Sequence, residues 1–243
     1  MGGALCEYQN EQFKIIIPNI MISSENEFAF KYANTSDYTG GYHGDERIDI
    51  DASSYIKFLL DGCPINISEM QSDINKWCNN FAYIEYSTLH ATSEDGENII
   101  NDHPIIAYHY KETIIGEKIK IRNVVRFVTS LNIVDYFSGL FCMGKNFARY
   151  AEISGQIFDT SRGSNSTFVG NDRTAEKVNF YNEIYKVGAS VESCIKRTNF
   201  SPNFSLQCDI WDRTNDTKYY RHLGSFSVSN NNIIETEMLV EYK

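Results

Sequence analysis

Hydrophobic and polar side chains alternate along much of the chain. Over residues 204–210, Phe-Ser-Leu-Gln-Cys-Asp-Ile, every second side chain falls on the same face of an extended strand. Other segments of this kind are rich in Ile, Val, Phe and Tyr, which is typical of β-strands. The pattern predicts strands over residues 13–22, 27–32, 82–90, 104–110, 113–127, 150–158, 204–211, 218–229 and 233–242.

Two segments have the spacing of a helix. Residues 68–71, Ser-Glu-Met-Gln, match a capping box, in which the serine hydroxyl accepts a hydrogen bond from a backbone amide and the glutamine reaches back. The apolar positions here recur at helical intervals: Met70, Ile74, Trp77 or Cys78, and Phe81. Residues 174–187 place three apolar or aromatic side chains on one face, with Gly188 as the stop: Val178, Tyr181 and Tyr185.

The remaining apolar segment, residues 124–142, fits a buried helix or two strands, and its periodicity does not decide between them. Together the patterns predict an α+β, β-rich fold: an antiparallel β-sandwich-like core with a few flanking helices. The 243 residues contain no internal repeat, no low-complexity linker and only four prolines. We therefore expect a single domain over residues 1–243.

The net charge of the chain argues against some classes of binding partner. The chain has 22 Lys and Arg against 32 Asp and Glu, which gives a net charge of −10. Such a surface repels phosphates and anionic lipid headgroups on average, so we expect neither direct nucleic-acid binding nor membrane binding. No apolar run reaches the roughly 20 residues that a membrane helix needs.

The first residues and the cysteines are used to predict the cellular compartment of the protein. The chain starts without the basic stretch and apolar core of a secretory signal, and Gly2 with Cys6 leaves lipid attachment as a lesser alternative. The six cysteines form no CxxC motif and no Cys/His pair at metal-ligand spacing. We therefore expect reduced, mostly buried thiols, no metal site and a cytosolic protein.

The common catalytic and phosphate-binding motifs HExxH, GxSxG, GxxxxGK[ST] and GxGxxG do not occur. The glycine-rich residues 40–44 could cradle a phosphate through backbone amides, but Asp45 and Glu46 follow and would oppose an anion. A plain turn is therefore favoured there. No motif by itself identifies a catalytic residue.

The segment 234–240, Ile-Glu-Thr-Glu-Met-Leu-Val, resembles the Glu-x-Glu strand entry of mono-ADP-ribosyltransferase toxins. The resemblance implies that Glu237 stabilises the oxocarbenium ion formed as nicotinamide leaves NAD, and that Glu235 activates the acceptor. It also implies an arginine that holds the NAD phosphates, for which Arg122 is the candidate, and a Ser-Thr-Ser strand, for which Ser166 begins the nearest match. That match departs from the family at its third residue, Phe168. The alternative is that both glutamates form the solvent side of an alternating strand.

A second resemblance covers residues 150–211. This stretch has a strand ending in Ile-Ser-Gly at 153–155, a Ser/Asn loop through 168–170, a helical insert, and then residues 191–194 leading to a strand with Cys208 and Trp211. It resembles the cypovirus polyhedrins, β-rich single-domain proteins that crystallise inside infected insect cells and embed virions. The departure is at the N-terminus, where the glycine-rich start does not look like the amphipathic arm helix of that family.

The polyhedrin resemblance implies a structural protein that self-assembles into an intracellular crystalline occlusion body, protects virions and dissolves at alkaline pH. The implied partners are copies of the chain, in an oligomer and a lattice, and virus particles, all in the cytoplasm of the host cell. It implies no catalytic residues and no required cofactor, and leaves open whether a nucleotide lodges between subunits. The alternative is the NAD-using transferase with Arg122, Ser166, Glu235 and Glu237.

Tyrosine content suggests how such an assembly could respond to pH. The chain has 16 tyrosines, and titrating every Tyr, Cys and Lys in strong alkali would take the net charge from −10 towards about −45. Near neutral pH, tyrosine rings could bury apolar area at subunit contacts while their hydroxyls form hydrogen bonds. We therefore expect phenolate formation and the loss of lysine charge to break ion pairs and release the cargo.

Overall fold

The computed structural model describes residues 2–9, 12–17, 26–32, 55–65, 74–90, 105–116, 118–133, 136–145 and 148–242. Within them the fold is all β, with 66% of residues in strands and no helix. The predicted α+β class with flanking helices is therefore wrong, whereas its β-rich character agrees with the structure. The glycine-rich residues 40–44 and the capping box at 68–71 lie outside the described residues.

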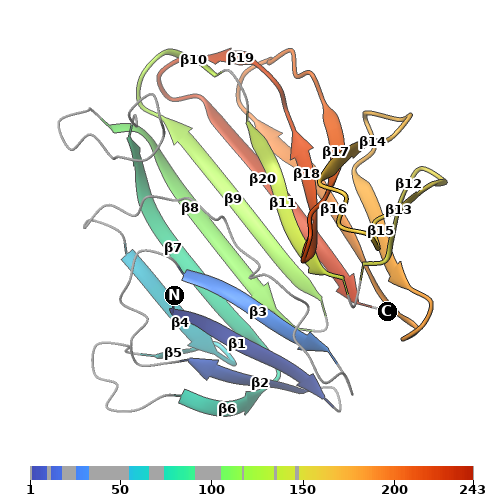
Figure 1. Ribbon diagram of the computed structural model, residues 1–243. Coiled ribbons are helices and arrows are strands. Elements are labelled where there is room, and N and C mark those ends of the chain that lie inside the picture. The colour runs from blue at the N-terminus through green and yellow to red at the C-terminus, as the bar shows by residue number, and fades with distance from the viewer. Residues whose placement is uncertain are drawn as a thin grey trace.

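The largest element is a ten-stranded antiparallel sheet (Figure 1). Its strands, in spatial order, are β13 (Gln156–Asp159), β12 (Tyr150–Ile153), β15 (Lys177–Asn182), β16 (Val187–Thr198), β20 (Ile233–Tyr242), β9 (Ile119–Phe127), β8 (Ile105–Ile115), β7 (Phe81–His90), β4 (Tyr55–Leu60) and β5 (Cys63–Ile65). The long strands β16, β20, β9 and β8 form its centre. Four neighbouring pairs, β12/β13, β15/β16, β8/β9 and β4/β5, are hairpins joined by short turns, as antiparallel pairing allows.

A four-stranded antiparallel sheet packs on one face of the ten-stranded sheet. Its order is β11 (Phe137–Gly144), β18 (Asp216–His222), β17 (Gln207–Asp212) and β14 (Ser166–Val169). Two smaller sheets complete the described fold: β10 (Leu131–Ile133) with β19 (Phe226–Val228), and β3 (Asn26–Tyr32), β1 (Gly2–Gln9), β2 (Gln12–Ile17) and β6 (Ile74–Cys78). β1 and β3 are parallel, whereas the other pairings in these sheets are antiparallel.

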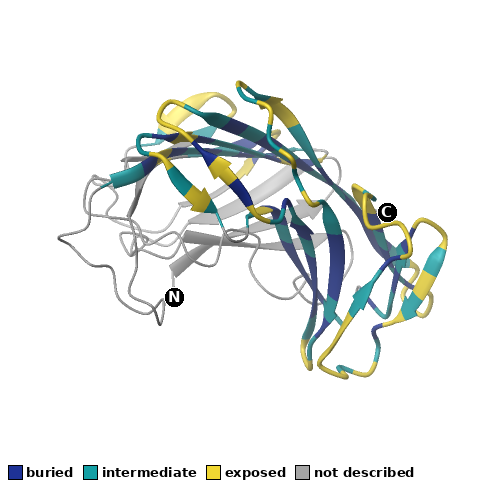
Figure 2. Ribbon diagram, turned by 90° about the horizontal axis from the view of Figure 1, so that it is seen from above, coloured by how far each residue is buried: buried dark blue, intermediate teal, exposed yellow. Residues whose placement is uncertain are grey.

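The main core lies between the two large sheets. The ten-stranded sheet contributes Ile121, Val191 and Met238, and the four-stranded sheet contributes Phe141 and Ile210, among others. Along β20, Ile234, Thr236, Met238 and Val240 are buried, while the residues between them are half-buried. This alternation separates an inner face towards the core from an outer face. Seen from above, exposed residues gather mainly at the turns (Figure 2).

The helix predicted from residue 68 onwards is wrong where the chain is described. Residues 74–78 form β6 and Phe81 begins β7. The turn between them is held by Asp61, whose Oδ1 accepts hydrogen bonds from the backbone N–H groups of Asn79 and Asn80, at 2.8 and 2.9 Å. Apolar residues four apart, such as Ile74 and Cys78, share a face in a strand as well as in a helix, so their spacing did not discriminate.

The helix predicted over residues 174–187 is also wrong. This segment contains β15, in which Val178, Phe180 and Asn182 are buried in strict alternation. Asn182 then accepts a hydrogen bond on Oδ1 from the N–H of Ile184, at 2.9 Å, which begins the turn to β16. Residues 124–142 form the end of β9, then β10, and most of β11, so the helical alternative for this segment is wrong too.

Candidate functional site

Three of the four residues proposed for a transferase lie together on the outer face of the ten-stranded sheet. β9 and β20 are antiparallel neighbours, and their register places Arg122 opposite Glu237 and Val124 opposite Glu235. The flanking residues Ile121 and Met238 point into the core. The sheet therefore turns Arg122, Glu235 and Glu237 away from the core and towards the same surface.

These three residues form a network with two lysines, which we call the charge ladder: Lys120, Arg122, Lys196, Glu235 and Glu237. Arg122 Nε donates a hydrogen bond to Glu235 Oε1 at 2.7 Å. Glu237 lies between two ammonium groups, with Oε2 at 2.7 Å from Lys120 Nζ and Oε1 at 2.9 Å from Lys196 Nζ. Partial burial raises the pKa of Glu237, but hydrogen bonds from Lys120 and Lys196 outweigh it and hold the pKa below its usual value.

The ladder therefore holds an ionised carboxylate rather than a proton donor. Both oxygens of Glu237 contact lysines, and Glu235 contacts Arg122. A carboxylate with a lowered pKa stays charged near neutral pH and cannot act there as a general acid. In this arrangement Arg122 Nε donates its hydrogen bond to Glu235, so the guanidinium group already has a carboxylate partner within the ladder.

Ser166 does not join the other three residues. It lies on β14 in the four-stranded sheet, opposite Asp212 of β17. That sheet packs against the inner face of the ten-stranded sheet, whereas Arg122, Glu235 and Glu237 lie on the outer face. The structure thus brings together Arg122, Glu235 and Glu237 and leaves Ser166 on a different sheet.

Tyrosines extend the outer face next to the ladder. The Tyr110 ring lies 5.7 Å from the Arg122 guanidinium carbon and 5.0 Å from the Tyr86 ring, between ring centroids for the tyrosines. Burial and the nearby Glu112 carboxylate raise the pKa of Tyr110 to about 12. Tyr86 and Tyr108 each leave 50% of their surface exposed. We call Tyr86, Tyr108 and Tyr110 the tyrosine row.

A second group of polar residues surrounds the buried carboxyl of Asp212, and the sequence motifs did not reveal it. Lys145 Nζ forms an ion pair with Asp212 and donates to the Thr160 carbonyl at 2.7 Å and to Thr217 Oγ1 at 3.0 Å. Asp212 also accepts hydrogen bonds from the backbone N–H and the hydroxyl of Ser164, both at 2.6 Å. We call these five residues the buried ion cluster. It ties the segments after β11 and β13 to the end of β17.

The carboxyl of Asp212 is fully buried, whereas Lys145 keeps 18% of its side chain exposed. Burial raises the pKa of Asp212, but Lys145 and Ser164 more than offset this and keep the pKa below its usual value. A turn could be predicted from Arg162-Gly163-Ser164-Asn165. Its partner Asp212 lies 48 residues further along, and nothing in the sequence indicates that pairing.

The described residues contain no group of three or more His, Cys, Asp or Glu side chains placed to hold a metal ion. Nor does this part of the chain contain a helix long and apolar enough to cross a membrane. Of the cysteines in it, Cys78, Cys142 and Cys208 are buried. Burial raises the pKa of Cys78 to about 11 and that of Cys208 to about 12.

No protein-family model matches the sequence, and no curated protein is similar to it. Among solved structures, the chain is similar to the Slr1438 protein from Synechocystis sp. PCC 6803, with 7% identity and a TM-score of 0.38 over 68% of this chain and 62% of that one. It is also similar to heparinase III, the BT4657 gene product, with 10% identity and a TM-score of 0.33 over 76% of this chain and 23% of that one. The chain thus spans under two thirds of the first and about a quarter of the second. Similarities of this size identify neither a family nor an activity.

Proposed function

We propose that this protein is a structural protein that assembles with copies of itself through the outer face of the ten-stranded sheet. One observation carries the proposal: Tyr86 and Tyr108 leave half of their surface exposed on a sheet face that continues into the charge ladder. Tyrosine is enriched where proteins contact proteins, because its ring buries apolar area while its hydroxyl keeps a hydrogen-bond partner.

Charge favours a second copy as the partner. The charge ladder contains three cations and two carboxylates, and Glu112 lies opposite Arg122 on the same face, so this patch is close to neutral, while the whole chain carries −10. An acidic copy of the chain is therefore repelled less by this face than by the rest of the surface, and carboxylates of that copy can pair with the ladder lysines. Contact between two different patches is heterologous, and such contacts build open arrays when they do not close into a ring.

In the form that the polyhedrin resemblance suggests, the array is an occlusion body that embeds virions and dissolves in alkali. On the contact face, Tyr110 needs strongly basic conditions before it ionises, because burial and the nearby Glu112 carboxylate raise its pKa to about 12. Lys196 also keeps its proton longer, since its hydrogen bond to Glu237 raises its pKa. Dissolution should therefore begin above the ordinary pKa of tyrosine, about 10.

Expression in insect cells with light microscopy tests the proposal. Wild type and Tyr185→Ser, which alters an exposed tyrosine on the turn between β15 and β16, should form intracellular particles. Tyr86→Ser/Tyr108→Ser should stay dispersed at the same expression level. Wild type that never forms particles, or a double variant that forms them as readily as wild type, would overturn the proposal. A turbidity titration of purified particles should show them dissolving above about pH 10; unchanged solubility would remove the alkaline step.

The alternative, an NAD-using transferase, retains one favourable observation, the adjacency of Arg122, Glu235 and Glu237 on one face. Incubation of the purified protein with labelled NAD and acceptor proteins distinguishes the two. The structural proposal expects no label transfer from wild type. Transfer that disappears in Glu237→Gln, while the variant remains folded by circular dichroism, would replace the structural proposal with the enzyme.

A further inference from the structure

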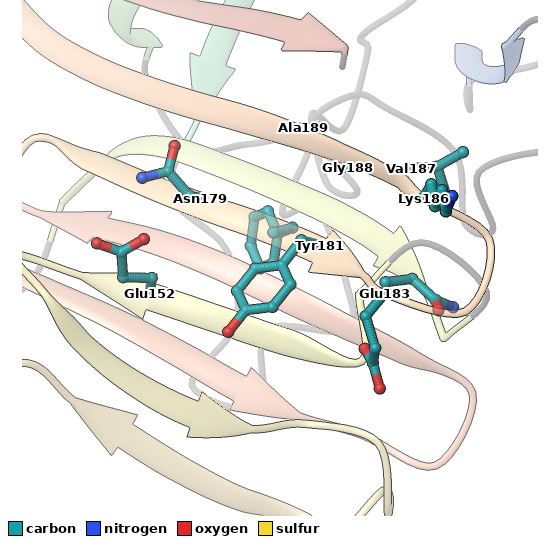
Figure 3. Close-up of a pocket in the computed structure, with 10 residues that line it drawn as sticks. Glu152, Asn179, Tyr181, Glu183, Lys186, Val187, Gly188 and Ala189 are labelled. Carbon is teal, nitrogen blue, oxygen red and sulfur yellow. The ribbon is translucent and has the colours of Figure 1, made fainter.

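A groove opens on the outer face of the ten-stranded sheet near its β13 edge, away from the tyrosine row. Its volume is about 460 Å³, and its walls include Glu152 of β12, Asn179 and Tyr181 of β15, and Glu183 and Lys186 of the turn that follows. In Figure 3 the Tyr181 ring lies between the side chains of Glu152 and Glu183. A groove of this volume falls within the roughly 300–1,000 Å³ range of small-molecule sites.

Strand register explains how these side chains come to share one surface. Glu152 is opposite Asn179, and Tyr150 is opposite Tyr181. On the other side, Tyr181 is opposite Gly188, which adds no side chain to its row. The rings of Tyr150 and Tyr181 are stacked, with centroids 5.3 Å apart and an angle of 23° between planes. Two neighbouring strands thus build an aromatic platform beside a row of polar groups.

Two buried polar atoms in or beside this groove have no hydrogen-bond partner among the described residues. Asn179 Oδ1 belongs to the groove wall, whereas Nε of Arg149, the residue before β12, lies outside the wall next to Glu183. The Arg149 Nε lies 3.8 Å from Glu183 Oε1, too far for a hydrogen bond. A buried polar atom without a partner costs free energy, so each is a position where a ligand or a water molecule would be stabilised. One atom is an acceptor and the other a donor, so they favour a ligand that can both donate and accept.

The charges at the groove point to a neutral ligand. Two carboxylates, Glu152 and Glu183, and one cation, Lys186, line the groove. Arg149 lies outside the wall, but its Nε is 3.8 Å from Glu183 Oε1 and offsets the second carboxylate, so the charges in and beside the groove balance. A metal ion or a phosphate would need an excess of one sign. Hydroxyl groups, in contrast, donate to carboxylate and amide oxygens and accept from ammonium and guanidinium groups. The apolar C–H face of a sugar ring can also pack on the tyrosine platform.

We infer that this groove is a carbohydrate-binding site that takes one or two neutral hexose units. Tyr181 supplies the platform, Asn179 and Glu152 hydrogen-bond to ring hydroxyls, and Lys186 contacts the ligand at the far end. The inference does not depend on self-assembly, because the groove lies away from the tyrosine row and its test is read out by ligand binding.

Saturation-transfer-difference NMR on the full chain tests the site. The probes are glucose, galactose, mannose, N-acetylglucosamine, cellobiose and maltose, with putrescine and inorganic phosphate as charged comparisons. At least one saccharide should receive saturation, and neither charged probe should compete with it. No transfer to any saccharide, or displacement of a bound saccharide by putrescine or phosphate, would overturn the inference; the first result would mean that water alone satisfies Asn179 and Arg149.

Variants locate the binding. Tyr181→Ala and Asn179→Leu should each raise the dissociation constant of the saccharide that binds wild type most tightly by at least about tenfold. Glu152→Gln should raise it by a smaller factor. Tyr185→Ala is the matched control, because this exposed tyrosine is on the same turn but outside the groove lining, and it should bind as wild type. If Tyr181→Ala does not fold, Asn179→Leu and Glu152→Gln still decide. Saccharide binding that none of the three folded groove variants changes would contradict the assignment.

Discussion

The charge ladder and the buried ion cluster use the same chemistry in two different surroundings. Both place a carboxylate between lysine ammonium groups or hydroxyls at hydrogen-bond distance. In the ladder, Lys120 and Lys196 leave nearly half of their side chains exposed, whereas the Asp212 carboxyl is fully buried. Water screens the first set of pairs and offers each ion an alternative partner, but it does not reach the Asp212 carboxyl and reaches only a small part of Lys145. Similar ion pairs therefore leave the charge ladder accessible to partners, whereas in the buried ion cluster they stabilise the fold.

The largest expected effect comes from breaking the buried ion cluster. Asp212→Asn keeps the shape of the side chain but leaves Lys145 without its counter-ion, and should lower the free energy of unfolding by about 3–5 kcal/mol. Urea denaturation followed by circular dichroism measures this. Asp159→Asn is the matched control, because Asp159 ends β13 next to Thr160 of the cluster but is partly exposed, and it should cost less than about 1 kcal/mol. Equal losses in the two variants would erase the contrast with the ladder.

Acid sharpens the same contrast. The pKa of Asp212 is lower in the folded chain than in the unfolded chain, so its ion pair stabilises the fold above the ordinary Asp pKa of about 3.9 and this stabilisation is lost as pH falls through the folded value. The difference in unfolding free energy between wild type and Asp212→Asn should be constant from about pH 5 to 7 and shrink below about pH 4. A difference that stays constant down to about pH 2 would show that the carboxylate charge is not what stabilises the loops.

Alkali tests the outer face. Tyr110 has a pKa of about 12 in the folded chain, so above about pH 10 the unfolded chain releases this proton first and stability falls until the folded group also ionises. Wild type should therefore lose free energy of unfolding as the pH rises from about 10 to about 12. Tyr110→Phe, which has no phenol to ionise, should lose roughly 1–2 kcal/mol less over this range, after allowance for screening by water. Guanidinium denaturation at a series of alkaline pH values measures it. Identical slopes for wild type and Tyr110→Phe would contradict the burial of this phenol.

The smallest effect is expected within the charge ladder. Glu237→Gln should lower the free energy of unfolding by less than about 1 kcal/mol, because its lysine partners regain water. The loss should shrink further in 1 M salt, where screening shortens the Debye length to about 3 Å. A salt-independent loss as large as that of Asp212→Asn would mean that the ladder is a structural element like the buried cluster.

The period-two pattern predicted strands well where one face is buried and the other is not. β20 has the bounds of the predicted segment 233–242, and its burial alternates. β17 overlaps the predicted segment 204–211 but starts at Gln207 and ends at Asp212, and most of its residues are buried. The pattern failed where apolar residues four apart fit both a helix and a strand, as at Ile74 and Cys78. Over residues 174–187, the buried Phe180 and Asn182 were the discriminating positions, and Asn182 carries a polar side chain that a hydrophobic pattern does not count.

The candidate sites were less predictable than the strands. The exposed side of the Glu235 and Glu237 strand could be anticipated from alternation, but not their cations: Lys120 and Lys196 come from the strands on either side of β20. Strand order and register decide which distant residues come into contact, and the spacing of residues within one strand predicts neither. The same reason hid the pairing of Lys145 with Asp212 and the sheet on which Ser166 lies.

Light scattering of the purified chain tests the central claim most directly, because it measures whether the outer face binds copies of the chain. Lys120→Glu/Lys196→Glu makes the ladder acidic while the rest of the surface is unchanged. The weight-average mass of wild type should rise with protein concentration at low salt and fall back in 0.5 M salt, whereas the double variant should remain monomeric throughout. A wild type that is monomeric at every concentration, or a double variant that associates as strongly as wild type, would contradict self-assembly through this face.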